Sequence, residues 1–294
     1  MRLFTPLSAN SEQWSTPEPI RTREVGWSII VVFVGAATGL ELLLLTIQRA
    51  PVLGSLFAGA AWKGNLFFFA TLLLVAVCGI LFGLGRLRPA DVGVVRGKLV
   101  EGILVTSAVW LADQTIAAVS AILTTPTTIA HTWTTNGWQG TLLWTAVMFL
   151  GAALYEETAF RGFLYPQLYL KFRGSHRVRF WTALLVSQLL FAIGHVPAHL
   201  MIRHLSGREL WTTVILQGLI GVVLLLLYLR TRNLWISVGI HGLVNAPTPL
   251  LEGTIGPAVF LVVLLIGWPW IVRRSQQRGL ARVERAERSL LSKG

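Results

Sequence analysis

The chain has 294 residues, of which 54% are hydrophobic and 13% charged, and its mean hydropathy is +0.65. The charged share is about half that of an ordinary soluble domain, so composition predicts a membrane protein and excludes one large soluble core. The net charge of +12 does not indicate nucleic-acid binding, because most Lys and Arg residues lie in short connections between apolar blocks. A single cysteine, Cys78, excludes a disulfide framework and a cysteine metal site.

Residues 1–25 read as a polar tail and not as a cleavable signal peptide, because no short apolar core follows a basic start. A helix needs about 20 apolar residues to cross the hydrocarbon of a bilayer. We therefore predict an all-α, polytopic bundle of about eight transmembrane helices over residues 26–272, followed by a basic tail over 273–294. The eight blocks are 27–47, 66–85, 99–123, 140–170 (interrupted), 179–198, 210–229, 234–247 and 254–272.

The Lys and Arg residues also predict an orientation. If the N-terminus is cytoplasmic, the inner segments hold 20 of these cations and the outer loops hold 4, while Arg161 lies inside the fourth block. This positive-inside asymmetry predicts that both termini are cytoplasmic and that the number of crossings is even. We expect an integral, multi-pass protein in contact with the lipid bilayer, in the plasma (inner) membrane if the cell is prokaryotic.

Ionisable side chains inside membrane spans are functional candidates, because each costs about 2.5–3.5 kcal/mol or more at the helix centre. For the isolated acids Glu41, Glu101 and Asp113, a packing or hydrogen-bonding role is favoured, since nothing nearby in the sequence supplies a partner. The other candidates are Glu156, Glu157, Arg161, His195 and His241.

The stretch 154-LYEETAFRGF-163 carries three of these charges. Glu157 and Arg161 are four residues apart with the acid first, which favours a helical ion pair. Glu156 is offset by about 100° around the helix and has Phe160 at its i+4 position, so it is free for chemistry. Alternatively, both glutamates share Arg161 in a structural cluster.

The stretch 191-FAIGH-195 places His195 at the end of the fifth block, where a lone histidine is more often an interhelical donor than a catalytic group. His199 follows at i+4, but a zincin helix requires Glu directly after the first histidine, and here Val196 is followed by Pro197. Pro197 predicts a kink or a helix end. We expect His195 to be functional and His199 to be interfacial.

The stretch 241-HGLVN-245 places His241 and Asn245 on one helical face, and their side chains can together stabilise an oxyanion. A hydrogen-bonded interhelical pair is the alternative. The candidate groups of these three segments comprise two carboxylates, two imidazoles and an amide. Such a set suits water activation by carboxylate and imidazole with a separate oxyanion hole.

The motifs 156-EETAFR-161, 191-FAIGH-195 and 241-HGLVN-245 resemble those of the CPBP family of intramembrane proteases. That family includes CAAX prenyl proteases of the Rce1 type and bacterial abortive-infection and bacteriocin-immunity membrane proteins. The resemblance covers a core over 140–250, and 88-RPADVGVVRG-97 resembles the amphipathic segment that often precedes it. It implies hydrolysis of a peptide bond in a membrane-associated, prenylated or other, substrate. It further implies that Glu156 is the general base assisted by His195, that Glu157 and Arg161 support the site, and that His241 and Asn245 form the oxyanion hole.

The resemblance leaves the need for a metal open. Glu156, His195 and His241 can bind Zn²⁺ from separate helices, or the carboxylate can act without a metal. Two other functions remain: a non-enzymatic membrane protein of the same fold, such as an immunity factor or secretion partner, and a proton-coupled transporter. The non-enzymatic protein is disfavoured because the sequence keeps the full set of polar residues that the catalytic roles require. The transporter would use Glu41, Asp113 and Glu156 as a relay, but no inverted repeat supports it.

Overall fold

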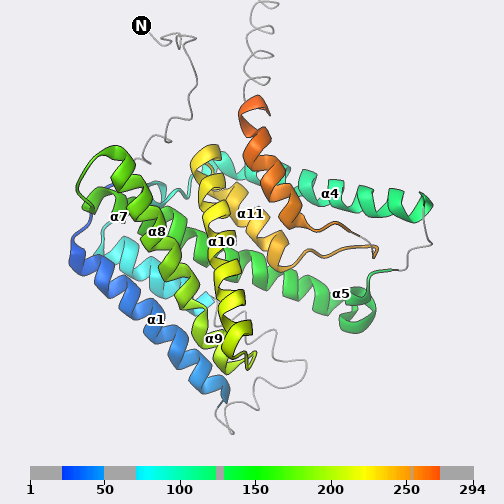
Figure 1. Ribbon diagram of the computed structural model, residues 1–294, viewed down its shortest axis with the longest axis horizontal. Helices are drawn as coiled ribbons and strands as arrows, with labels where there is room; N and C mark the ends of the chain where they lie inside the picture. Colours follow the sequence, from blue (N-terminus) through cyan, green and yellow to red (C-terminus); the bar gives the residue numbers. More distant parts are fainter. Residues whose placement is uncertain (1–21, 50–70, 124–128, 253, 272–294) are drawn as a thin grey trace, which may run out of the picture.

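The computed structural model describes residues 22–49, 71–123, 129–252 and 254–271. Within these ranges the chain is helical and contains no strand, which confirms the predicted all-α class. The only extended pairing there is an isolated antiparallel bridge between Ile129 and Leu251. Figure 1 shows long helices crossing one another at steep angles around the short helix α11, Leu234–Asn245.

Five helical stretches of the described chain are long and apolar enough to cross a membrane. They are Trp27–Ile47, Arg96–Leu123, His131–Lys171, His176–Met201 and Gly207–Thr231. Three shorter apolar helices are Thr71–Leu84, Leu234–Asn245 and Pro257–Ile271. These segments follow the predicted blocks in order, whereas eight crossings and cytoplasmic termini stay predictions. Most of the predicted N-terminal tail and the whole predicted C-terminal tail lie outside the described residues.

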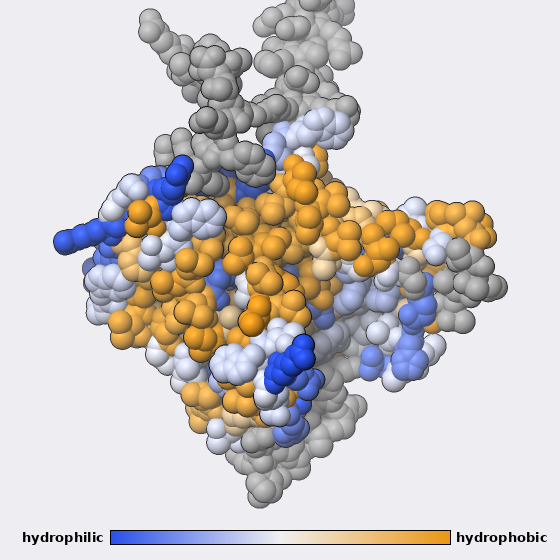
Figure 2. All heavy atoms as spheres, in the orientation of Figure 1, coloured by the Kyte–Doolittle hydropathy of each residue, from blue (hydrophilic) through white to orange (hydrophobic). Residues whose placement is uncertain are grey.

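The outer surface of the bundle is apolar. Figure 2 shows hydrophobic residues covering much of the face in view, and side chains such as Ile122, Leu185 and Ile266 are 83%, 62% and 72% exposed. In water such a surface would promote aggregation, but hydrocarbon is the natural solvent for it. The surface and the long apolar helices together define an integral membrane protein.

The fourth predicted block is longer and more regular than expected. It runs from His131 to Lys171 as one helical stretch, with a non-helical kink at Gly137, where φ is 64°. Two π-helical segments flank Glu156, and such wide turns often mark functional sites. In chain order the parts are α5 (His131–Ala146), η6 (Val147–Ala153), α6 (Leu154–Glu156), η7 (Glu157–Leu164) and α7 (Tyr165–Lys171).

Helix α11 lies deep in the bundle and packs against α4 (Leu99–Leu123), α10 (Gly207–Thr231), η6 and η7. Glycine permits the closest of these approaches: a Cβ atom at Gly239 would lie 1.7 Å from Thr106 Oγ1 of α4. A Cβ atom at Gly242 would lie 2.6 Å from the Phe149 ring of η6. The sequence motif therefore holds His241 between two helices that flank it closely.

The remaining helices surround this centre. Helix α8 (His176–Gly194) packs against α7 and α10, and α9 (Val196–Met201) contacts α1 (Trp27–Arg49). The segment Thr71–Leu84 ends in the π-helical turn η3 (Gly79–Leu84), which packs against α1. Two short 3-10 turns, η4 (Pro89–Val92) and η5 (Arg96–Lys98), lead from there into α4.

The polar residues before α1 are attached to the rest of the fold at one end of the bundle. Arg23 Nε lies 2.8 Å from Asp91 Oδ2 in η4, and the Arg88 backbone N–H donates to the same oxygen over 2.7 Å. Gln167 of α7 accepts from Val25 N over 3.0 Å and donates to Arg23 O over 2.7 Å. These contacts join α1, η4 and α7 next to the helix that carries the glutamates.

Candidate active site

The ion pair expected between Glu157 and Arg161 is present and fully enclosed. Arg161 Nη1 lies 3.1 Å from Glu157 Oε1, and both side chains are 0% exposed. Arg161 Nη2 also donates to Gly221 O of α10 over 3.1 Å, and the guanidinium carbon lies 4.5 Å from the centre of the Phe191 ring. A carboxylate, a carbonyl and an aromatic face thus compensate a buried cation.

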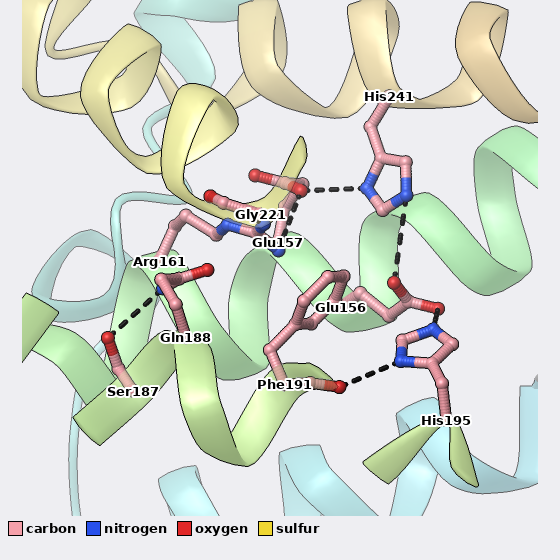
Figure 3. A network of polar contacts seen from close by, with 9 residues as sticks. All are labelled: Glu156, Glu157, Arg161, Ser187, Gln188, Phe191, His195, Gly221 and His241. Carbon is pink, nitrogen blue, oxygen red and sulfur yellow. Dashed lines mark hydrogen bonds and ion pairs between the residues drawn. The ribbon is translucent and has the colours of Figure 1, made fainter. Parts of the chain in front are cut away.

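His241 connects the two neighbouring glutamates (Figure 3). Its Nδ1 lies 2.7 Å from Glu157 Oε1, and its Nε2 lies 3.6 Å from Glu156 Oε2. An ionised carboxylate only accepts, so Nδ1–H donates to Glu157, and in the neutral ring Nε2 presents a lone pair towards Glu156. The Glu157 contact was not foreseen from sequence, because 84 residues separate the partners.

His195 faces Glu156 from another helix. It forms the C-cap of α8, and α9 begins at the next residue with Pro197 in its first turn, as the predicted helix end required. Its Nδ1 lies 2.8 Å from Phe191 O and must donate, because a carbonyl only accepts. Its Nε2 is therefore the acceptor of the neutral ring, and it lies 3.8 Å from Glu156 Oε1.

Glu156 thus lies between two imidazole Nε2 atoms at 3.6 and 3.8 Å. Both distances exceed a direct hydrogen bond, and all the facing atoms are acceptors when the rings are neutral. Glu156 Oε2 is buried and has no hydrogen-bond partner in the described chain. The arrangement calls for a proton donor between these groups, and a water molecule or a substrate group fits that role.

His199, predicted to be interfacial, is buried in the bundle with a residue exposure of 3%. Its depth in the membrane stays a prediction. The ring stacks on His195 with centroids 6.2 Å apart, and Nε2 lies 2.9 Å from Gln217 Oε1 of α10, to which it donates. Gln217 was missed by sequence reasoning, since a glutamine in an apolar helix carries no distinguishing local pattern.

Asn245 is the one sequence-predicted site residue that stands apart from the cluster. It is the last residue of α11 and its side chain is exposed. Within the described ranges no hydrogen bond engages its amide. His241 contacts both glutamates, and the Asn245 amide stays available to a ligand, so the predicted oxyanion hole of His241 and Asn245 stays a prediction.

The three isolated acids have different surroundings. Glu101 accepts from Asn233 Nδ2 over 2.9 Å, and the fully buried Asp113 accepts from Gly256 N over 3.1 Å. These two contacts agree with the predicted hydrogen-bonding role. Glu41 instead lines a cavity together with Glu156, and Asp113 does not line it. A relay through Glu41, Asp113 and Glu156 therefore gains no support.

The cavity beside Glu156 and His195 has a volume of about 450 Å³. It lies between α1, the helix that carries Glu156, and the junction of α8 and α9, and its walls are mainly apolar. Aromatic side chains such as Tyr155, Phe160 and Phe191 line the part near the carboxylate. Volume and lining are typical of a ligand pocket with few polar groups.

The arrangement of donor side chains decides whether the site can hold a metal ion. In the described part of the chain, no group of three or more His, Cys, Asp or Glu side chains is arranged to hold one. The predicted set of Glu156, His195 and His241 is not among such groups, and a zinc ion there stays a prediction.

The fold and the site define an integral membrane protein with paired carboxylates and imidazoles inside the bundle. Residues 137–247 match the family model described as Rce1-like, type II CAAX prenyl endopeptidase. The match supports the resemblance to the CPBP and CAAX protease family, and the matched residues include all six predicted site residues. Comparisons with curated proteins and with solved structures gave no match.

Proposed function

We propose that this protein is an intramembrane endopeptidase that hydrolyses a peptide bond in a membrane-associated substrate of the CAAX type. The match of residues 137–247 to the Rce1-like family model supports protease activity. The observation that carries the mechanism is the position of Glu156 between His195 Nε2 and His241 Nε2, beside an apolar cavity.

In the proposed reaction, a water molecule donates one hydrogen bond to Glu156 and the other to His195 Nε2. Glu156 takes a proton from this water as the hydroxide oxygen attacks the substrate carbonyl carbon. The carbonyl π bond opens to an oxyanion. The proton on Glu156 then passes to the amide nitrogen, the C–N bond breaks, and an acid and an amine are released.

We assign stabilisation of the oxyanion to His241 and Asn245. Glu157 pairs with Arg161 and accepts from His241 Nδ1–H, so these two contacts fix the orientation of the ring. When Nε2 carries a proton, it donates to the oxyanion, and the Asn245 amide adds a second donor. Glu157 and Arg161 act through His241 and are positioning residues.

The apolar walls of the cavity support a substrate with hydrophobic groups near the cleaved bond. A prenylated C-terminus has this character, and so does an apolar side chain of a membrane-anchored peptide. Phe160 and Phe191 pack edge to face, with centroids 5.1 Å apart, and form a firm wall for such a group.

The test uses the full chain in nanodiscs with a panel of prenylated and membrane-anchored peptides. We expect Glu156→Gln to lower kcat by about 10²–10⁴-fold, which is the usual contribution of a general base. Glu209→Gln is the matched control, because Glu209 is an exposed acid at the start of α10. Equal cleavage by wild type and Glu156→Gln would contradict the mechanism. Binding without cleavage by wild type would instead favour the non-enzymatic alternative.

A further inference from the structure

The face of α1 that turns towards the cavity carries an unexplained acid. Lining residues of α1 recur at helical spacing, so a single stripe of the helix faces the pocket. Glu41 lies in the middle of that stripe, and Thr38 is its only other polar member. The stripe consists of Phe33, Val34, Ala37, Thr38, Glu41, Leu44 and Leu45.

Glu41 has no counter-charge beside it on its own helix. Its i−4 and i+4 neighbours on the stripe are Ala37 and Leu45, which are apolar. Within the described residues no hydrogen bond or ion pair engages its carboxylate, in contrast to Glu101 and Asp113. A carboxylate in such apolar surroundings is costly unless a ligand compensates it.

A ligand that fills this cavity lies against both Glu156 and Glu41. Both acids line one cavity of about 450 Å³, which is the size of a pocket for a single small ligand or a short chain segment. Glu41 enters from α1, whereas Glu156 and His195 enter from the opposite helices. The proposed mechanism assigns roles to Glu156 and His195 but none to Glu41.

We propose that Glu41 is a specificity residue that binds a Lys or Arg side chain of the substrate, close to the cleaved bond. An ammonium or guanidinium group is the partner that a carboxylate favours most where the surroundings are apolar and screening is weak. The remaining apolar wall covers the methylene groups of such a side chain, while Glu41 holds its charged end. The proposal rests on the proposed peptidase function and defines its substrate class.

The test compares two anchored peptides that differ at one position, Lys against norleucine, scanned over the residues around the cleaved bond. Nanodiscs of phosphatidylglycerol are used, so that no lipid amine competes for Glu41. At one scanned position we expect wild type to prefer Lys about 10- to 100-fold in kcat/KM, which is the usual effect of one charge-assisted hydrogen bond. Glu41→Gln should remove this preference by raising KM for the Lys peptide, and it should still cleave the norleucine peptide. Glu209→Gln should behave as wild type.

Binding to the Glu156→Gln variant separates this proposal from the peptidase itself. A Lys preference in Kd that Glu41→Gln abolishes supports the cation subsite even if wild type cleaves no peptide, in which case only the peptidase proposal fails. Three results would overturn the subsite: no Lys preference at any position, a preference that Glu41→Gln retains, or an equal loss of kcat for both peptides. The last would assign Glu41 to the chemical step.

Discussion

His241 Nδ1 lies 2.7 Å from Glu157 Oε1, while the Nε2 of the same ring lies 3.6 Å from Glu156 Oε2. One imidazole therefore connects a carboxylate that pairs with Arg161 to a carboxylate that pairs with no Lys or Arg in the described part of the chain. The two glutamates are adjacent in the chain, yet this ring gives them different surroundings. The difference supports separate tasks, orientation for Glu157 and proton transfer for Glu156.

The Arg161 ion pair leads to a prediction about stability. Arg161→Met leaves Glu157 as an uncompensated charge in the interior, so the free energy of unfolding falls by about 3–5 kcal/mol. Denaturant titration in mixed micelles measures this change. The double variant Glu157→Gln/Arg161→Met removes both charges and should recover much of the loss. A double variant as unstable as Arg161→Met alone would show that the charge of Glu157 is not the cause.

The proposed oxyanion donors lead to a prediction about rate. Asn245→Ala should lower kcat by about 10²–10³-fold with little change in KM, as is usual when one donor to an oxyanion is lost. The fold should persist, because the side chain is exposed and no hydrogen bond to it is found in the described ranges. Circular dichroism and single-turnover cleavage measure the two properties. If Asn245→Ala keeps the wild-type kcat, His241 donates to the oxyanion and Asn245 does not.

Metal removal tests the carboxylate mechanism. Dialysis against EDTA or 1,10-phenanthroline should leave kcat/KM unchanged, because no metal takes part in the proposed steps. Elemental analysis of the purified protein should find less than one zinc per chain. If chelation abolishes cleavage and Zn²⁺ restores it, the reaction instead depends on the ion, and Glu156, His195 and His241 become the candidate ligands.

The Arg23–Asp91 contact predicts that the stability of the fold depends on pH in the acidic range. Partial burial raises the pKa of Asp91, but the N–H of Arg88 and the hydrogen bond and charge of Arg23 outweigh it and hold the pKa below its ordinary 3.8. Since the folded pKa is depressed, the contact stabilises the fold above about pH 4, and this stability is lost as pH falls through the folded value. Denaturation midpoints of wild type and Asp91→Asn should thus differ at pH 6, and the difference should narrow as pH falls below about 4. A constant gap would contradict this linkage.

Local sequence spacing predicted the features that one helix can determine by itself. The Glu157–Arg161 pair follows from i,i+4 geometry, and the end of α8 follows from Pro197. The order of apolar helices followed from hydropathy, since each block must bury or expose its own surface. These features need no knowledge of neighbouring helices.

Contacts between helices could not be predicted from the sequence. The His241–Glu157 bond and the His199–Gln217 bond join residues whose approach depends on how each helix is rotated about its axis. The same rotation turns Glu41 towards the cavity, although its neighbours in sequence gave no reason to separate it from Glu101 or Asp113. The π turns η6 and η7 also lacked a sequence signal, since their apolar residues suit an α-helix equally well.

Because of the π turns, the positions of the site residues depend on the exact number of residues in this helix. An i→i+5 turn accommodates an additional residue without changing the direction of the helix. Deleting one residue from η7 would restore α spacing and turn everything beyond it by about 100°. The chain would remain apolar and helical, and it would keep every acid, base and cation, but Glu156 and Arg161 could no longer face their present partners together. Composition alone would therefore not reveal such a defect.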